Sequence, residues 1–332
     1  MAVTMESIKK LRAMTGAGLA DVKKALTEAE GDMDKAKDLL RERGLAIAAK
    51  RSDRETSNGC VLVKSENGFS AMIALKCETD FVANGKDYIA LTQSILDAAV
   101  AAKAKSLDEV KALKLESGDD IATAVQQRSG VTGEKMELDG YFFIEGENVE
   151  VYNHMRKNIL CTMVQTNKPA EDVAHKVAMQ VAAMKPVALN KESVPQEVVD
   201  NEFKVAVEKT KAELVQKAID AALNKAGINP AHVDSEDHMQ SNQDKGWITA
   251  EDVAKAKEII ATVGAEKAAN LNMQMIENIA KGRVQKFFKD SCLVEQEFQF
   301  GEGDKATVAQ WIASQDKELQ VVDYKRFSLQ AD

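Results

Sequence analysis

The hydrophobic period of this chain changes from helical to two at Gly59, and this change restricts the fold more than any other feature. Alternating residues predict a strand at Cys60–Val63, a hairpin turn at Glu66–Gly68 and a return strand at Phe69–Cys77. A helical pattern then covers residues 86–102. This part of the chain is therefore predicted to contain antiparallel strands followed by a helix.

The alternating pattern returns later in the chain, which predicts a duplicated unit. Residues 135–165 again predict strands, and a helical pattern over residues 170–184 follows them. The run Leu160–Asn167 echoes Leu75–Asp80, since each carries a cysteine in a strand and then a threonine and an Asx residue. Helices mixed with antiparallel strands predict an α+β fold class with two related core subdomains.

The stretch Leu75–Asn84 joins the return strand to the helix that follows. The residues at this strand end are Thr79, Asp80, Phe81 and Val82. Two interpretations stay open. In one, Thr79 or Asp80 caps the next helix and Phe81 is core; in the other, Phe81 is an exposed wedge with Asp80 beside it. Spacing does not separate them, because buried phenylalanines and charged caps are both common.

Residues 4–44 have the pattern of three short helices, and Gly44 stands where a left-handed helix stop is expected. So few residues bury only a small core, and such a module commonly binds a partner with what it leaves exposed. Met14 and Leu19 are candidates for an apolar surface patch with lysines at its edge. The alternative, that both residues complete the small core, is equally favoured.

The second half of the chain is mostly helical in pattern. An amphipathic run covers residues 198–226, and the polar residues 228–246 predict a loop. Thr249–Asp252 matches a capping box at the start of the next helix, and helical spacing continues over residues 265–288. These patterns predict a helical hairpin that projects from the second core subdomain.

Charge and hydropathy exclude several classes of protein. With 332 residues and a formal charge of −9, the chain lacks the general attraction to phosphate backbones that a primary nucleic-acid-binding protein has. The start of the chain has no apolar signal core, and no run of about 18 apolar residues occurs. We therefore expect a cytoplasmic soluble protein without direct contact to nucleic acid or membrane.

Motifs for catalysis or cofactor binding are absent from the sequence. The four cysteines have no Cys-x-x-Cys spacing and no cluster with the four histidines, so free buried thiols are expected rather than a zinc or redox site. The phosphate-cradling loop, the nucleophile elbow and the His-Glu-x-x-His motif are missing. No metal site or cofactor is expected, and the chain is predicted not to be an enzyme with chemistry of its own.

Four separate motifs follow one another in this chain. They are Leu11–Leu26 with Gly31-Asp32, Cys77–Val82, Ala178–Met184 with Pro186, and Gly282–Phe288. In this order they resemble the bacterial elongation factor Ts family, whose members are guanine-nucleotide exchange factors for the GTPase elongation factor Tu. The resemblance covers residues 1–205 and 275–329, and the agreement of four ordered motifs makes it specific.

The resemblance implies a domain organisation that agrees with the periodicity. It consists of a ubiquitin-associated-like three-helix domain (1–50), a linker (51–58), core subdomain N (59–134), core subdomain C (135–205 and 275–300), a coiled-coil-like helical hairpin insertion (206–274) and a C-terminal module (301–332).

The resemblance also implies which residues bind the partner. In the family a Thr-Asp-Phe-Val tip is inserted into the GTPase near its magnesium and phosphate site. By this resemblance, the tip of this chain binds the partner and displaces the Mg²⁺ ion of the GTPase. The residues of the tip are Thr79, Asp80, Phe81 and Val82.

Three further contact regions follow from the resemblance. One is the N-terminal module, the second is a contact turn, and the third is a histidine that contacts the phosphate-binding loop region of the partner. The residues at these positions are Leu19, Ala20, Lys23, Thr132, Gly133 and His154. After His154 the family usually has glycines, whereas this chain has Met155–Asn158. The insertion around 206–274 is also longer than the hairpin expected for the family.

The alternative function is a helical adaptor without exchange activity. In that case residues 1–44 and the hairpin bind another translational or ubiquitin-like partner. A thiol- or metal-based enzyme would need Cys77 or Cys161 beside a histidine.

Overall fold

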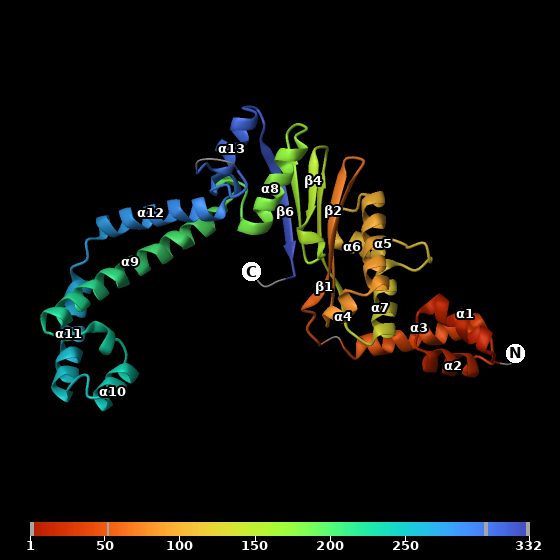
Figure 1. The fold of residues 1–332 in the computed structure, drawn as a ribbon, viewed down its shortest axis with the longest axis horizontal. Coiled ribbons are helices and arrows are strands. Elements are labelled where there is room, and N and C mark those ends of the chain that lie inside the picture. Colours follow the sequence, from red (N-terminus) through yellow and green to blue (C-terminus); the bar gives the residue numbers. More distant parts are fainter. Residues whose placement is uncertain (1–2, 52, 302–304, 330–332) are drawn as a thin grey trace. The chain divides into compact units, whose positions relative to one another are not determined.

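The computed structural model describes residues 3–51, 53–301 and 305–329. The chain divides into two compact units, Met1–Leu189 with Glu297–Asp332 and Asn190–Gln296 (Figure 1). Helices and antiparallel strands both occur, which confirms the α+β fold class. Within the described residues, no helix is long and apolar enough to cross a membrane.

Three short helices form the N-terminal part of the first unit. They are α1 (Met5–Thr15), α2 (Leu19–Glu28) and α3 (Met33–Ala49). Their apolar faces meet in a small core whose buried residues are Ile8, Leu11, Ala17, Val22, Ala25, Leu26, Ala29 and Ala36. Three helices around a small core match the expectation, while the likeness to a ubiquitin-associated domain stays a prediction.

Helix α3 does not stop at Gly44, so the predicted helix end is wrong. Gly44 is buried inside α3, where its backbone meets Gly130 of α7 (Ile121–Thr132). A Cβ atom on Gly130 would lie 2.2 Å from the Cα of Gly44. Two glycines at one crossing let the helix backbones approach more closely than any side chain allows. Gly44 therefore serves helix packing and not a left-handed turn.

Within the described residues, six strands form two antiparallel three-stranded sheets. The first sheet contains β1 (Asn58–Glu66), β2 (Phe69–Cys77) and β3 (Met136–Glu145), with β2 in the middle. The second sheet contains β4 (Val149–Asn153), β5 (Leu160–Thr166) and β6 (Val321–Ser328), with β5 in the middle.

The pairing of the strands differs from the predicted subdomain boundaries. β3 pairs with β2, with Met136 opposite Cys77, so it belongs to the first sheet although the predicted boundary at residue 134 assigns it to subdomain C. β6 pairs with β5, so the residues predicted as a separate C-terminal module complete the second sheet. The reason is that strand pairing joins distant segments, which a hydrophobic period does not specify.

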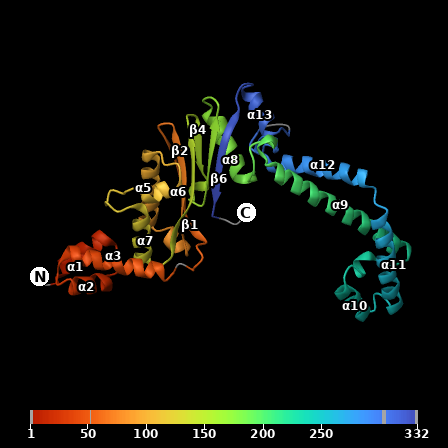
Figure 2. The ribbon, with the colours of Figure 1, turned by 180° about the vertical axis from the view of Figure 1, so that it is seen from behind.

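Strand β2 lies inside a layered core, with helices on one side and the second sheet on the other. The helices over the first sheet are α5 (Lys86–Ala102), α6 (Leu107–Ala112) and α7. The odd-numbered residues of β2 face these helices, whereas Met72 and Ala74 face Cys161 and Met163 of the second sheet. Helix α8 (Glu171–Met184) covers the opposite face of the second sheet (Figure 2).

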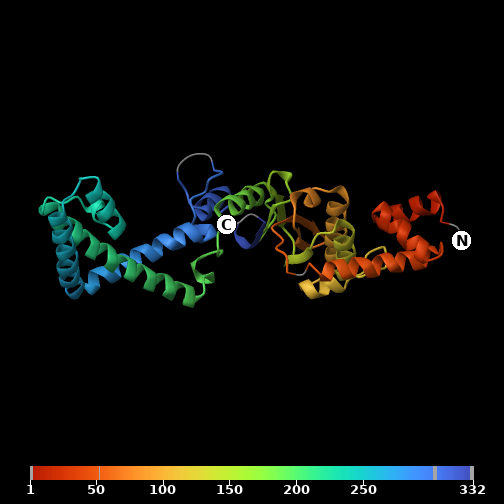
Figure 3. The same cartoon turned by 90° about the horizontal axis from the view of Figure 1, so that it is seen from below.

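The second unit is helical, as the pattern of the insertion predicts. Its helices are α9 (Gln196–Lys225), α10 (Glu236–Asp244), α11 (Ala250–Ala269) and α12 (Met273–Ser291). Helix α9 packs against both α11 and α12 (Figure 3). The predicted continuous helix over residues 265–288 is wrong, because the chain breaks between α11 and α12. Asn272 caps α12 there by accepting a hydrogen bond from the Met275 amide at 3.0 Å.

The polar segment 228–246 contains helix α10 and is not only the predicted loop. Ser235 caps α10 by accepting a hydrogen bond from the His238 amide at 3.2 Å. Met239 of α10 packs with Leu223 of α9 and with Ile248 in a small core of its own. Apolar residues spaced so widely give too weak a period to be recognised in the sequence.

Alanine substitutions at two helical glycines are expected to act in opposite directions. Gly130→Ala places a methyl group against the backbone of Gly44, and we expect it to destabilise the first unit by about 2 kcal/mol. Gly282 of α12 meets open space, so Gly282→Ala is expected to stabilise the second unit by up to about 1 kcal/mol. Chemical denaturation followed by circular dichroism measures both, and a stabilising Gly130→Ala would contradict the close crossing.

Candidate functional site

The chain that leaves β2 forms a one-turn helix, α4 (Asp80–Ala83). Thr79 is its N-cap, since the Thr79 hydroxyl accepts a hydrogen bond from the Val82 amide at 3.3 Å. Phe81 is 86% exposed, the largest fraction among the large hydrophobic side chains that the structure describes. Each interpretation of this stretch therefore holds in part: Thr79 caps the turn, and Phe81 is exposed and not core.

The other residues of α4 connect the exposed ring to the core. Val82 is partly buried and packs against the core between the first sheet and its helices, and Ala83 is buried in that core. Asp80 is exposed, and its carbonyl accepts a hydrogen bond from the Asn84 side-chain amide at 2.8 Å. The turn is thus anchored on one side and presents a carboxylate and an aromatic ring on the other.

Glu78 ties the start of the turn to its surroundings. Its carboxylate pairs with Arg54 at 2.8 Å and with Arg51 at 3.7 Å, and it accepts a hydrogen bond from the Lys135 amide at 2.6 Å. The Lys135 amide, and after it Arg54, hold the pKa of Glu78 below its usual value. The sequence interpretation missed both arginines, because they lie in a charged segment that reads as a linker.

Thr132 is the last residue of α7 and Gly133 is its C-cap, at the start of the turn to β3. The Thr132 hydroxyl donates to the Arg128 carbonyl at 3.1 Å, and Gly133 has a φ of 72°, which glycine adopts without strain. Because β3 begins at Met136, opposite Cys77 at the end of β2, this turn lies beside α4.

His154 begins a short 3₁₀ turn after β4, and its Nδ1 lies 3.1 Å from the Tyr152 hydroxyl. Met155, Arg156 and Asn158 have φ values of 52°, 55° and 56°, in the left-handed region that glycine favours. The chain therefore keeps a backbone conformation suited to the glycines that its resemblance would place here. Non-glycine residues in this region store local strain.

Three of the predicted regions lie at the same end of the two sheets (Figure 1). The tip follows the end of β2, the turn at Thr132 precedes β3, and the loop at His154 joins β4 to β5. The Asn158 carbonyl accepts a hydrogen bond from the Val61 amide near the start of β1 at 2.7 Å, which ties this loop to the same end.

Leu19, Ala20 and Lys23 lie on a different surface, at the start of α2. All three side chains are exposed, and Leu19 and the neighbouring Met14 are 51% and 57% exposed. Both residues are therefore exposed, and the alternative that they complete the small core is wrong. Exposed apolar side chains of this kind fit contact with another protein.

Met155 is an exposed apolar residue that the sequence interpretation did not assign to the site. It is 65% exposed and lies directly after His154. The signal was present in the sequence, because a large apolar residue replaces an expected glycine in a loop. Its exposure adds a second apolar side chain to the end of the sheets that carries Phe81.

Within the described residues, no group of three or more histidine, cysteine, aspartate or glutamate side chains is arranged to hold a metal ion. The four cysteines are buried and form no disulfide, as predicted. Burial raises the pKa of Cys60 and of Cys161 to about 12, so both thiols are protonated at neutral pH and react poorly.

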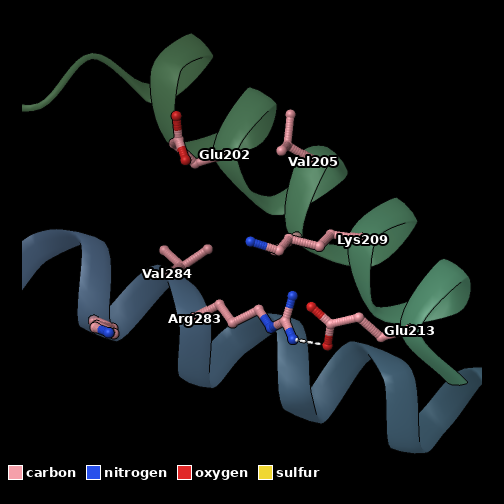
Figure 4. A pocket seen from close by; sticks show the side chains of 8 residues that line it. Glu202, Val205, Lys209, Glu213, Arg283 and Val284 are labelled. Atoms are coloured by element: carbon pink, nitrogen blue, oxygen red, sulfur yellow. Dashed lines mark hydrogen bonds and ion pairs between the residues drawn. The ribbon is translucent and has the colours of Figure 1, made fainter. Parts of the chain in front are cut away.

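A groove of about 420 Å³ lies between α9 and α12 in the second unit (Figure 4). The residues that line it are Glu202, Val205, Ala206, Lys209, Glu213, Arg283, Val284 and Lys286. Arg283 pairs with Glu213 across the two helices. The motif Gly282–Phe288 thus contributes an ion pair that joins α12 to α9.

Known proteins are similar to this chain over its full length. A family model described as elongation factor TS matches residues 78–229 and 216–331. The chain is 62% identical to elongation factor Ts of Parabacteroides distasonis and 63% identical to that of Bacteroides fragilis, over 100% of both chains in each case. The protein of that name from Porphyromonas gingivalis is 39% identical, again over 100% of both chains. The full-length matches also include the N-terminal helices, which precede the residues that the family model matches.

Lowering the pH is expected to loosen the base of the tip. The pKa of Glu78 is lower in the folded than in the unfolded chain, so the ionised carboxylate stabilises the fold above the unfolded pKa of about 4.3. This stabilisation is lost as the pH falls through the lowered, folded-state pKa. We expect the protection of the Lys135 amide against hydrogen exchange to fall over this window, and Glu78→Gln to remove the pH dependence. Equal pH dependence in both proteins would contradict this role of Glu78.

Proposed function

The chain belongs to the elongation factor Ts family, and on that premise we propose that it binds elongation factor Tu carrying GDP and catalyses release of GDP and its exchange for GTP. It acts by disturbing the magnesium and phosphate site of the GTPase and performs no chemistry of its own. Its tip is the group that enters the partner.

The exposure of Phe81 is the observation that supports this function most directly. Burial of a phenylalanine side chain stabilises a complex by about 1.5–3 kcal/mol relative to its exposure to water. The ring is held on a turn that Val82 and Ala83 anchor in the core. Because close-packed interiors move between discrete arrangements, a ring inserted against a packed element of the partner displaces that element as a whole.

The polar neighbours of the ring act on the metal ion. Magnesium requires near-ideal octahedral oxygen geometry, so a small displacement of its ligands weakens its binding. The exposed carboxylate of Asp80 disturbs the hydrogen bonds around that ion when the ring beside it is inserted. Once magnesium is lost, the charge of the phosphates is no longer neutralised and GDP dissociates.

Acceleration of release follows from thermodynamic linkage. A factor that binds the nucleotide-free GTPase more tightly than the loaded one weakens nucleotide binding by the same free energy. A coupling of about 4 kcal/mol accelerates release about a thousandfold if all of it appears in the dissociation rate. The protein–protein contact supplies this free energy, so the mechanism uses no cofactor.

The remaining contact regions dock the factor on the GTPase. Leu19, Ala20 and Lys23 form one contact through the exposed start of α2. The turn at Thr132 and the loop at His154 contact the partner next to the tip, because they lie at the same end of the sheets. Two separate contacts strengthen binding, since the second forms within a complex that the first already holds together.

Phe81→Ala is expected to leave the fold intact and to slow exchange. Because the ring is 86% exposed, we expect the free energy of unfolding to change by no more than about 0.5 kcal/mol. Release of labelled GDP from loaded elongation factor Tu is expected to slow at least ~tenfold, as the loss of a burial of about 1.5–3 kcal/mol requires.

The matched control is Val187→Ala, which truncates a side chain that is 69% exposed on the segment after α8. This protein is expected to exchange like the unmodified chain. Unimpaired exchange by a folded Phe81→Ala protein would remove the wedge role. Unchanged GDP release in the presence of the unmodified chain at micromolar concentration would reject the exchange function itself.

A further inference from the structure

The β2–β3 ladder ends at the pair Cys77 and Met136, yet the two segments stay connected beyond it. The Thr79 amide donates to Oε2 of Glu134 at 3.0 Å, and the Thr79 hydroxyl donates to Oε1 of the same carboxylate at 2.6 Å. A side-chain carboxylate thus supplies the acceptors that a backbone carbonyl would supply if the ladder continued.

A second hydrogen bond of this kind, between the residues adjacent to Thr79 and Glu134, has its donor and acceptor on the opposite segments. The Lys135 amide donates to the carboxylate of Glu78, so each segment offers a glutamate to an amide of the other. The Asn58 side-chain amide also donates to the Glu78 carbonyl at 2.9 Å. These reciprocal bonds fix the base of the tip to the start of β3 and of β1.

Glu134 is itself held by its own turn. The Ser129 hydroxyl donates to the Glu134 carbonyl, and the Glu134 amide donates to the Thr132 hydroxyl at 3.3 Å. Ser129 is buried, and Gly133 reverses the chain just before Glu134. The backbone of Glu134 is therefore held at both its amide and its carbonyl, which fixes the origin of the side chain that binds Thr79.

The Glu134 carboxylate accepts both of these hydrogen bonds from Thr79, which caps α4. The Thr79 hydroxyl donates to Glu134 and at the same time accepts from the Val82 amide. Without the carboxylate, the hydroxyl rotates more freely, and the cap of this short helix rests on a single bond at 3.3 Å. Phe81 lies inside that turn, so the orientation of its ring depends on this chain of hydrogen bonds.

From these contacts we propose that Glu134 is a positioning residue that orients the tip and thereby sets the maximal rate of nucleotide exchange. It acts through Thr79 and needs no contact with nucleotide or metal. The proposal rests on the proposed function, in which Phe81 opens the site of the partner. A loosely held tip occupies the productive orientation for a smaller fraction of the time, and the maximal rate falls in proportion to that fraction. Docking through α2 does not change.

Glu134→Ala and Glu134→Gln test this proposal, because the first removes both acceptor oxygens and the second retains one. GDP release measured over a range of factor concentrations separates the maximal rate from the half-saturating concentration. We expect Glu134→Ala to lower the maximal rate ~tenfold, with the half-saturating concentration changed by less than about twofold. The value for Glu134→Gln is expected to lie between those of Glu134→Ala and the unmodified chain.

Two further variants show whether the effect passes through the tip. Glu137→Gln is the matched control, since Glu137 lies close by on β3 and accepts a hydrogen bond from the Thr56 hydroxyl at 3.0 Å, not from the tip. It is expected to exchange at the unmodified rate. Thr79→Val combined with Glu134→Ala is expected to slow exchange by less than the product of the two single effects, because both changes interrupt one chain of bonds.

Amide hydrogen exchange tests the same point without the GTPase. We expect Glu134→Ala to reduce protection of the Val82 amide and to leave Ile73, in the middle of β2, unchanged. An unchanged maximal rate in Glu134→Ala would overturn the proposal. Loss of protection at Ile73 would also overturn it, since it would assign Glu134 to overall stability. If the unmodified chain does not accelerate GDP release, the proposed function fails, whereas the Val82 amide still reports whether Glu134 holds the tip.

Discussion

Strand β2 is covered on both faces, by helices on one side and by the second sheet on the other. It is buried along almost its whole length, so it cannot slide or bend without disturbing two layers of side chains. The turn that carries Phe81 continues directly from this strand. A mobile loop would yield when its ring met a packed surface, whereas a turn on a fixed strand keeps its position. The sheets thus hold an exposed aromatic ring rigidly, as the proposed insertion into a partner would require.

The tip is held by hydrogen bonds where it leaves β2, and it ends in an exposed apolar side chain. Glu78 and Thr79 are joined to neighbouring segments by hydrogen bonds and ion pairs, while the ring of Phe81 remains in water. Met14 and Leu19 are further exposed apolar side chains, on the N-terminal helices. Exposed apolar area is unfavourable in water. Covering either surface with another protein therefore lowers the free energy. Under the proposed function, these are two separate places at which the partner would contact the first unit.

Local signals predicted the elements well where they lie close together in the chain. The strand Phe69–Cys77 and the helix over residues 86–102 have the predicted bounds, since a hairpin turn and a change of period mark them within a few residues. The end of α3 was predicted wrongly, because a glycine serves equally as a left-handed stop and as a site of close approach. Only Gly130 on another helix shows that Gly44 has the second use.

The amino-acid sequence by itself determined the order of the elements, the family motifs and the identity of the tip residues, because these depend on neighbours along the chain. The tertiary structure decided that Phe81 is exposed, that β3 belongs to the first sheet and that Glu134 holds Thr79. Thr79 and Glu134 are 55 positions apart in the chain. Burial, strand pairing and hydrogen bonds over such separations arise only when the layers pack together, and no local period records them.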